Sequence, residues 1–586
     1  MGFIASNMAP IMFGSLILFL LFGAPVAFSL AACGLFFGFV GIEMGLLPEA
    51  LMQALPLRIF GIMQNDTLLA IPFFTFMGLI LERSGMAEDL LDTIGQLFGP
   101  IRGGLGYAAI LVGAMLAATT GVVAASVISM GLISLPIMLR YGYDRRLATG
   151  VIAASGTLAQ IIPPSLVLIV LADQLGKSVG DLYKGAFIPG FILTAAYLGY
   201  VAVLSVLRPA SAPALPKEAR TIKEDDGSAG LRSLAVLTVI AVCAAVLFAK
   251  WRPATTPTDE LIVTAMCVGV GTAFALSVLN RLFRLKLLSR MAERVTFVLI
   301  PPLALIFLVL GTIFLGVATP TEGGAMGSVG ALAMAISRRR LSMRLLRQAL
   351  DTTTKLSSFV LMILVGSTTF SLSFQAVDGA VWVEHLLTGL PGGQLGFLIV
   401  VNLLIFFLAF FLDFFELAFI IVPLVGPVAA KLGIDLTWFG VLLAINMQTS
   451  FMHPPFGFAL FYLRSVAPVT DYDDKVTGKR IRKVTTGDIY RGAIPFVVIQ
   501  VVMVAIVIFF PGIVTGNLDK PVAIDVDKAF QEMRKDSRED STNPYVNPPS
   551  GAEAPASAAA PSSDANVDPM QALIESMKRN PSPKKP

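Results

Sequence analysis

GDLYKGA, residues 180–186, returns as GDIYRGA, residues 487–493. A pair of prolines inside a long apolar run precedes each copy, Pro163-Pro164 before the first and Pro454-Pro455 before the second. Proline removes a hydrogen bond from a helix interior and clashes with the preceding turn. Each run therefore predicts a membrane helix that is broken at its proline pair.

A third pair of strings lies ahead of the prolines, Leu105-Gly106-Tyr107 in one half and Leu395-Gly396-Phe397 in the other. The three pairs are offset by 307, 291 and 290 residues, so their order and spacing are kept. The chain is therefore predicted to consist of two related halves. In a membrane protein, interrupted helices at corresponding positions of two halves are typical of a transporter whose site lies where the halves meet.

The composition predicts a protein of the lipid bilayer. Of the 586 residues, 55% are hydrophobic and 14% are charged, whereas soluble domains carry about 25% charged residues. Apolar runs of roughly 20 residues, each long enough to span a bilayer, recur along most of the chain. The formal net charge of +4 is spread over many loops and gives no indication of nucleic-acid binding.

Four apolar segments are too long for a single crossing, and each has a break near its middle. The segments are 8–40, 104–139, 295–337 and 395–430. Their breaks are Gly23-Ala24-Pro25, Thr119-Thr120-Gly121, Ala318-Thr319-Pro320-Thr321 and Asp413-Phe414-Phe415-Glu416. A helix, a short turn and a second helix predict a hairpin whose ends share one side. We expect 104–139 and 395–430 to be re-entrant hairpins, which are tolerated where protein or a water cavity covers the turn.

Lysine and arginine test this topology. Four connecting stretches hold five to seven of these residues each, namely 208–232, 281–294, 338–355 and 464–491. Four others hold two or fewer, namely 41–60, 172–184, 250–260 and 378–394. The positive-inside rule places the first group in the cytoplasm. With four double-passing segments, every basic stretch falls on one side, the two halves are inverted, and both termini are periplasmic.

The predicted fold class is thus an all-α polytopic membrane protein with two inverted-topology repeats that contain re-entrant hairpins and broken helices. The tail is rich in Pro, Ala, Ser and Asp and cannot bury enough apolar surface to fold. The predicted regions are a first repeat at 1–207 with a broken helix at 147–171, an insertion with two extra transmembrane helices at 208–294, a second repeat at 295–515 with a broken helix at 436–463, and a disordered periplasmic tail at 516–586.

The chemistry is expected at the broken elements. A helix that ends inside the membrane exposes carbonyl groups at one end and amide groups at the other. Carbonyl and hydroxyl oxygens hold a dehydrated Na⁺, and helix N-termini attract a carboxylate. The candidate residues before the proline pairs are Ser155, Gly156 and Thr157 in the first half and Asn446, Gln448 and Thr449 in the second. Those of the hairpins are Thr119, Thr120 and Gly121, Ser126 about two turns further on, and Asp413 and Glu416.

Each candidate has a simpler structural interpretation. Small residues let membrane helices pack closely, and proline pairs often mark only a kink, although the repetition of the whole arrangement favours an ion site. Asp413 and Glu416 are harder to dismiss, because carboxylates inside a membrane are costly and usually functional. Glu322 equally fits a helix cap, with Thr319 or Thr321 as N-cap residue around Pro320. His453 fits either a hydrogen-bonding core residue or a direct role with protons or substrate.

At this point the residues resemble the large membrane subunit of TRAP (tripartite ATP-independent periplasmic) transporters. The resemblance covers about 8–207 and 295–513. The stretches that carry it are IPFFTFMGLILERSGMAEDLLD at Ile71–Asp92, PIRGGLGYA at Pro100–Ala108, RYGYDRRLATGVIAASGTLAQIIPPS at Arg140–Ser165, GVATPTEGGAMGSVGAL at Gly316–Leu332, and Leu412-Asp413.

The resemblance implies an elevator-type, sodium-coupled importer of a small organic acid, a carboxylate, in the bacterial inner membrane. It implies two partners, a periplasmic binding protein that delivers the substrate and a separate small membrane subunit of about four helices. It implies no enzyme activity and no cofactor other than the coupling ion. Sodium is expected where the hairpin tips meet the unwound helices, at Thr119, Thr120, Gly121, Ser126, Ser155, Gly156, Thr157, Asp413, Asn446, Gln448 and Thr449.

The chain departs from the family pattern at three places. The first tip is usually rich in Gly and Ser, but reads Thr119-Thr120-Gly121-Val122-Val123 here. The second commonly reads Leu-Asp-Pro, but Phe414 replaces the proline and Glu416 adds a carboxylate. A threonine usually precedes the second proline pair, where this chain has His453. These departures bear on the second sodium site and on which acid is carried.

Two other functions are alternatives to this one. The first is a related two-repeat carboxylate carrier that works without a binding protein. The second is a membrane enzyme or a channel. The sequence contains no HExxH, GxSxG or P-loop motif, which argues against an enzyme and against an ATP-driven pump. Broken repeats with hairpins are more typical of alternating access than of a fixed pore.

Overall fold

The computed structural model describes residues 7–120, 123–222, 224, 230–253, 258–285, 287–454, 457–516 and 518. The chain divides into two compact units, 1–518 and 519–586. The second unit lies outside the described residues, and so does nearly all of the tail for which disorder is predicted.

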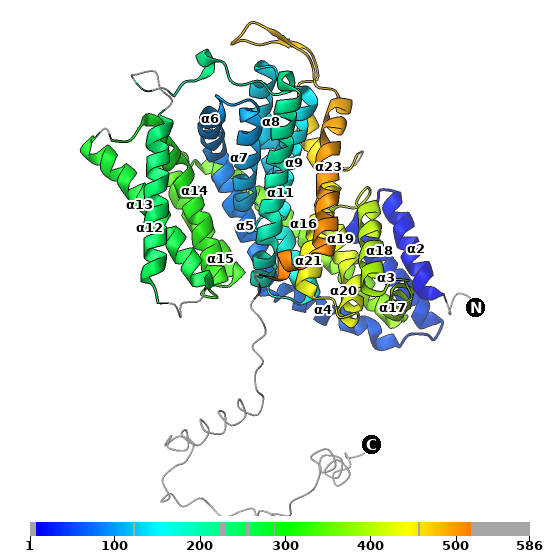
Figure 1. The fold of residues 1–586 in the computed structure, drawn as a ribbon. Helices are drawn as coiled ribbons and strands as arrows, with labels where there is room; N and C mark the ends of the chain where they lie inside the picture. Colours follow the sequence, from blue (N-terminus) through cyan, green and yellow to red (C-terminus); the bar gives the residue numbers. More distant parts are fainter. Residues whose placement is uncertain are drawn as a thin grey trace, which may run out of the picture. The chain divides into compact units, whose positions relative to one another are not determined.

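The described part is almost entirely helical, which confirms the predicted all-α polytopic fold class (Figure 1). Eight of its helices are long and apolar enough to cross a membrane, and up to eleven spans result if each of three bent helix pairs counts as one. Its strands are β1 (Tyr472–Asp473) and β2 (Arg480–Ile481), an antiparallel pair within one loop.

The helices follow the two halves of the sequence and the insertion between them. The first half contains α2 (Met8–Leu21), α3 (Val26–Glu43), α4 (Ala54–Met63), α5 (Asp66–Arg83), α6 (Met86–Phe98), α7 (Gly104–Thr120), α8 (Val123–Arg140), α9 (Arg145–Thr157), α10 (Leu166–Leu175) and α11 (Val179–Leu207). The insertion contains α12 (Leu231–Trp251) and α13 (Thr258–Phe283). The second half contains α14 (Arg290–Phe314), α15 (Pro320–Ser337), α16 (Met343–Ala376), α17 (Gly379–Thr388), α18 (Gly393–Leu408), α19 (Phe414–Ile420), α20 (Val422–Lys431), α21 (Leu436–Met447), α22 (Phe458–Val466), α23 (Thr486–Phe509) and α24 (Gly512–Thr515).

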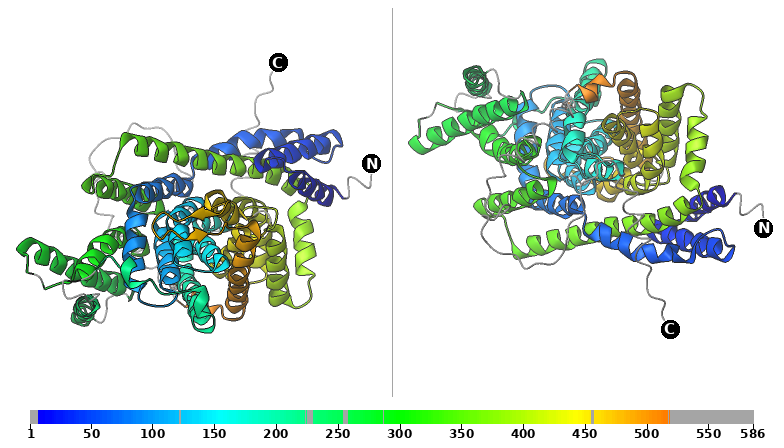
Figure 2. Two further views of the ribbon diagram at one scale, coloured as in Figure 1. Left: turned by 90° about the horizontal axis from the view of Figure 1, so that it is seen from above. Right: turned by 90° about the horizontal axis from the view of Figure 1, so that it is seen from below.

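The two halves exchange equivalent contacts. The last long helix of each half packs on the broken helix of the other half, α23 on α9 and α11 on α21. Likewise α3 packs along α16, and α15 packs along α5. We call α7–α11 with α18–α23 the core bundle and α3, α4, α5, α15 and α16 the flanking helices. Figure 2 shows α16 beside α3 along one edge of the core bundle.

The two hairpins open on opposite sides. The ends of the first are joined by a hydrogen bond of 3.1 Å from the Leu105 amide to the Tyr143 hydroxyl. The ends of the second are joined by one of 2.7 Å from the Gln394 side chain to the Leu432 carbonyl. The second opens beside Leu175, because a Cβ on Gly426 or Gly440 would lie within about 3 Å of that side chain. Leu175 ends α10, the second part of the first broken helix, whose first part, α9, begins on the side where the first hairpin opens. The two hairpins therefore open on opposite sides, so the halves are inverted.

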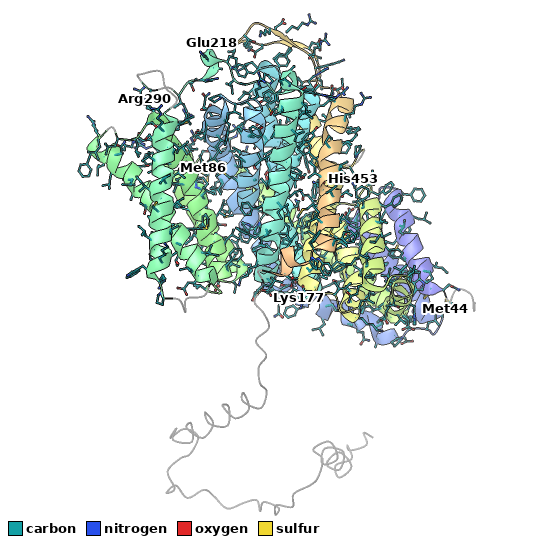
Figure 3. The ribbon with its side chains drawn as sticks, viewed as in Figure 1. Met44, Met86, Lys177, Glu218, Arg290 and His453 are labelled. Carbon is teal, nitrogen blue, oxygen red and sulfur yellow. The ribbon has the colours of Figure 1, made fainter. Side chains whose placement is uncertain are left out.

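The basic stretches lie on the side where the first hairpin opens. In Figure 3, Glu218 and Arg290 lie at that end, and Lys177 and Met44 lie at the other. The turn after α8 contacts the stretch 464–491, since Arg145 donates to the Lys483 carbonyl at 2.8 Å. Helix α6 contacts the other three stretches through bonds from Gln96 to Ala219, from Arg294 to Asp92 and from Arg338 to Asp89.

The repeated motif has a packing task. Gly492, in its second copy, faces Gly150 of α9 so closely that a Cβ on Gly150 would lie 2.1 Å from the Gly492 carbonyl oxygen. Gly185, in the first copy, faces α21 less closely, since a Cβ there would lie 3.4 Å from a methyl group of Val441 and 3.6 Å from that of Thr437. Small residues at both crossings let the helix backbones of the two halves approach. The motif therefore marks where the halves cross.

The insertion adds a peripheral helix pair. Helices α12 and α13 pack on each other and on α14. Only Leu237 of α12 is buried, whereas its many other apolar side chains are exposed. In a membrane protein such a surface faces lipid or another membrane chain.

Gly150→Ala should destabilise the chain, because the new methyl group would meet backbone that cannot rotate away. Overpacking of this kind costs about 1–3 kcal/mol. The measurement is thermal unfolding in detergent. Gly199→Ala is the control, since a Cβ there meets nothing within 4 Å. Equal melting temperatures for Gly150→Ala and wild type would contradict the close crossing of α9 and α23.

Candidate functional site

The first broken helix is interrupted at its proline pair, as predicted. Helix α9 ends at Thr157, a short 3-10 turn covers Leu158–Gln160, and α10 begins at Leu166. Pro163 and Pro164 lie in the non-helical connection and have no N–H group to give. The Ser165 hydroxyl donates to the Gln160 carbonyl at 2.6 Å, so one group freed by the break has a partner.

The second broken helix repeats this arrangement. Helix α21 ends at Met447, a 3-10 turn covers Gln448–Met452, and α22 begins at Phe458. The Thr449 hydroxyl donates to the Asn446 carbonyl at 2.7 Å. Pro454 lies in the connection, and Pro455 is outside the described residues.

The first hairpin covers the first break through side chains of minimal size. A Cβ on Gly113 of α7 would lie 2.4 Å from the Ser155 Cβ, and a Cβ on Gly156 would lie 2.4 Å from a methyl group of Val127 in α8. Gly113 and Gly156 therefore let the hairpin pack closely on the break. This close packing places Ser155 directly beneath the hairpin.

The second hairpin covers its break with a pair of amides. Asn446 donates to the side-chain oxygen of Asn402 in α18 at 2.9 Å and to its carbonyl at 2.8 Å. Both side chains are buried. Asn446 occupies the position that corresponds to Ser155, since the two residues are separated by the same offset as the proline pairs. In the first half this position holds a serine that packs against Gly113, and in the second half it holds an asparagine that hydrogen-bonds Asn402.

The two breaks meet at the Thr157 hydroxyl, which donates to the Met452 sulfur at 3.7 Å. Gln448 donates to the Thr157 hydroxyl at 3.2 Å, and both side chains are fully enclosed. These residues occupy corresponding positions in the two halves, again at the offset of 291. The pseudo-symmetry axis of the repeats therefore passes close to this bond, which we call the junction.

Further polar side chains surround the junction. The Tyr197 hydroxyl lies close to Thr157 and accepts from Gln500 of α23 at 2.9 Å. Four buried side-chain oxygens of the two breaks and of α23 have no hydrogen-bond partner among the described residues. They are Oε1 of Gln160, Gln448 and Gln500, and Oγ of Ser450. An unpaired buried acceptor costs about 1–3 kcal/mol, so this set suits a cation or water.

Asp413 and Glu416 form a capping box at the start of α19. The Glu416 amide donates to the Asp413 carboxylate at 2.9 Å, and the Asp413 amide donates to the Glu416 carboxylate at 2.9 Å. Because α19 packs on α10 and on the 3-10 turn Gln448–Met452, the box lies next to the second break.

Thr319 and Glu322 form a second capping box, at the start of α15. Thr319 is the N-cap residue, Pro320 follows it, and the Thr321 hydroxyl donates instead to the Asp66 carbonyl at 2.6 Å. Since α15 packs on α5 and α14, the structure does not bring this turn to the junction.

The first hairpin tip is described in part. Thr119 and Thr120 end α7, but their side chains and all of Gly121 are outside the described residues. Ser126 lies in the first turns of α8 and is fully buried. These four positions remain predictions.

His453 packs between two aromatic rings of the second hairpin. Its ring centroid lies 4.1 Å from that of Phe410, nearly parallel, and 4.5 Å from that of Phe406, nearly perpendicular. Its nitrogens make no hydrogen bond of good geometry among the described residues, although the Ala409 carbonyl is close. The ring thus holds the tip against the break.

Sequence reasoning missed Asn402, Tyr197 and Gln500. A single polar residue inside an apolar run, such as Gln500 in FVVIQVVMV, was the available signal, because such residues are costly in a membrane. Which helix each of them faces depends on the register between helices that are far apart in sequence.

A crevice of about 410 Å³ lies between the core bundle and the flanking helices on the side where the second hairpin opens. Arg58 of α4 and hydroxyl groups of α16, including Ser367, line its flanking wall, and Asp173 of α10 lines its core wall. Asn65 donates to Asp173 across it at 2.6 Å. Near the opposite side, Ser129 of the first hairpin donates to Glu82 of α5 at 2.5 Å.

The family model of the tripartite ATP-independent periplasmic transporter, DctM component, matches residues 13–513. The chain belongs to this family. It is a multi-pass large permease subunit of a TRAP transporter, and such subunits are transporters rather than enzymes.

Curated relatives match over most of their length. The uncharacterized protein YgiK of Salmonella typhimurium is 26% identical, over 86% of this chain and 95% of its own. The C4-dicarboxylate TRAP transporter large permease protein DctM of Rhodobacter capsulatus is 26% identical, over 77% of this chain and 89% of its own. A crystal structure of the Alcanivorax borkumensis YdaH transporter matches 80% of this chain and 90% of its own with 14% identity and a TM-score of 0.45, too distant to support an inference.

Asn446→Ala should lower the melting temperature in detergent, because the Asn402 side chain loses its buried partner at a cost of about 1–3 kcal/mol. Adding Asn402→Leu should recover part of the loss, since removing both partners of a buried bond is nearly neutral. A double variant no more stable than Asn446→Ala would contradict this account of the pair.

Proposed function

We propose that this permease imports a small organic acid, a carboxylate, across the bacterial inner membrane in symport with sodium. The observation that carries the proposal is the junction, where Thr157 and Gln448 join two interrupted helices and where the buried Gln448 Oε1 has no hydrogen-bond partner among the described residues. Hydroxyl, amide and carbonyl oxygens are the ligands that a small hard cation takes. Sodium bound there would bridge the two halves and neutralise part of the charge of an acid.

Relatives support the class of cargo. Some are named as permeases for C4-dicarboxylates, one for sialic acid and one for 2,3-diketo-L-gulonate. These compounds share a carboxylate, whereas another relative is named for isethionate, which is a sulfonate, so the class that the names support together is a small organic acid. The tripartite family also supports two partners, a periplasmic binding protein that delivers the acid and a small membrane subunit beside the flanking helices.

We further propose an elevator mechanism. The core bundle carries the junction and both hairpins, while the flanking helices are braced against each other through the pairs α3–α16 and α5–α15. The crevice between them is crossed by single hydrogen bonds such as that from Asn65 to Asp173, which a sliding movement can exchange at small cost. Substrate would enter through this crevice and leave on the basic side after the core bundle moves.

Ser155→Ala combined with Thr157→Ala should weaken sodium coupling. Uptake into proteoliposomes, with binding protein and small subunit present, should need at least tenfold more sodium for half-maximal rate, which corresponds to about 1.4 kcal/mol of lost binding. Ser134→Ala removes a buried hydroxyl of α8 away from the junction and is the control. An unchanged sodium dependence in the double variant would remove this site.

Asp413→Asn separates capping from ion binding. Asparagine caps a helix as well as aspartate does, so α19 should keep its start and the melting temperature should hold. Loss of the charge should still raise the sodium requirement or abolish uptake. Normal sodium-dependent uptake by Asp413→Asn would assign this carboxylate to capping alone.

A further inference from the structure

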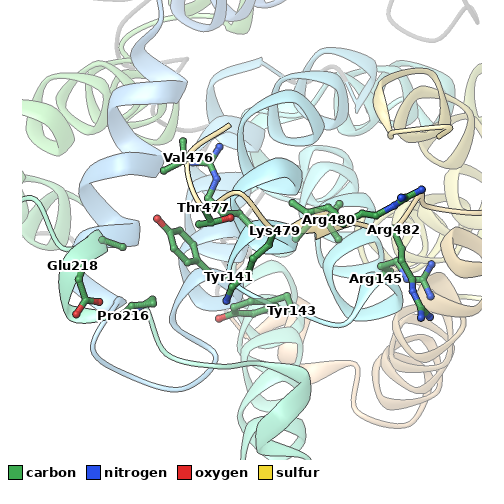
Figure 4. Close-up of a pocket in the computed structure, with 15 residues that line it drawn as sticks. Tyr141, Tyr143, Arg145, Pro216, Glu218, Val476, Thr477, Lys479, Arg480 and Arg482 are labelled. Carbon is green, nitrogen blue, oxygen red and sulfur yellow. The ribbon is translucent and has the colours of Figure 1, made fainter. Parts of the chain in front are cut away.

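A hollow of about 620 Å³ lies at the end of the core bundle where the first hairpin opens, away from the junction (Figure 4). Three segments form its walls: the turn between α8 and α9, the loop after α11 at 216–219, and the β1–β2 loop at 476–482. In Figure 4, Lys479 lies beside Tyr141 and Tyr143, and Arg480 and Arg482 line the neighbouring wall.

The hollow is strongly cationic. Five basic side chains line it against one carboxylate, Glu218; they are Arg140, Arg145, Lys479, Arg480 and Arg482. Arg140 is paired with Asp474 at 2.9 Å, and Arg145 lies 3.7 Å from Asp488, whereas Arg480 reaches Asp471 only at 3.9 Å. Among the described residues, Lys479 and Arg482 make no ion pair. Positive charge in excess of its counter-charges indicates an anionic ligand.

The loop that carries Lys479 is held in shape. Thr477 donates to the Asp474 carboxylate from its amide at 2.8 Å and from its hydroxyl at 2.6 Å, and these bonds, with Arg140, lower the pKa of Asp474. Gly478 turns the chain at a φ of +65°, and the Asp474 amide donates to the Lys479 carbonyl at 2.9 Å. A basic loop that served only as a topology signal would need no such bracing.

The position of the hollow favours a lipid headgroup as the source of the anion. The last turns of α11 expose Val203, Val206 and Leu207, so apolar surface reaches lipid directly before the loop that walls the hollow. Tyrosines are typical of the membrane interface, and Tyr141 and Tyr143 stand at this depth. The positive-inside rule assigns this face to the inner leaflet, whose anionic headgroups attract basic segments.

We propose that this hollow binds the phosphate group of an anionic phospholipid of the inner leaflet. Lys479 and Arg482 supply the free charges, and the tyrosines line the headgroup. A lipid held there ties the end of the core bundle to the membrane surface.

The test is native mass spectrometry of the full chain in detergent, titrated with phosphatidylglycerol or phosphatidylcholine. We expect phosphatidylglycerol to bind at least tenfold more tightly. Lys479→Gln with Arg482→Gln should abolish this preference. Lys475→Gln with Arg491→Gln, which removes the same charge from the same basic stretch outside the hollow, should keep it.

Three outcomes would overturn the proposal. They are equal binding of the two lipids by the wild type, equal losses in the two double variants, and displacement of phosphatidylglycerol by equimolar inorganic phosphate, which would make free phosphate the ligand. Melting temperatures of both double variants should match the wild type, since these exposed side chains bury little surface. If Lys479→Gln with Arg482→Gln loses both its fold and its lipid preference, Lys479→Arg decides the question. This variant keeps the charge and should keep the preference for phosphatidylglycerol.

Discussion

Backbone that leaves the helix inside a bilayer must find its hydrogen-bond partners within the protein, and this constraint organises the molecule. Each half of the chain interrupts one helix at a proline pair. The two interruptions are placed against each other, so that Gln448 of one half donates to Thr157 of the other. A position thus bonds to its own repeat counterpart, which places both interruptions at the pseudo-symmetry axis of the repeats.

The rest of the core bundle follows from covering these interruptions. Glycines at 113 and 156 let the first hairpin lie directly on its break, and an asparagine pair fills the equivalent place in the second half. Gly150 and Gly492 let the last helix of one half cross the broken helix of the other. In the proposed mechanism this covered unit travels as one body, so the junction never meets lipid while it carries an ion.

Much of this could be predicted from residues alone. The repeated strings, the proline pairs and the distribution of lysine and arginine indicate two inverted halves with broken helices, because each depends on local chain properties. Contacts such as that between Tyr197 and Gln500 could not, since they depend on helix register across about 300 residues. From the sequence, Glu322 fits a helix cap as well as a functional role, whereas Asp413 and Glu416 are predicted to be functional. All three lie in capping boxes, and only Asp413 and Glu416 lie beside a break.

The most direct measurement of the central claim is whether the core bundle must move past the flanking helices. Cysteines replacing Asn65 and Asp173, in a chain whose native cysteines are removed, can be bridged by mercuric ion across the crevice. The account predicts that bridging stops uptake and that reductant restores it, whereas a pair at Gln394 and Leu432, both within the core bundle, leaves uptake intact. Full uptake by the fully bridged Asn65–Asp173 variant would contradict the account.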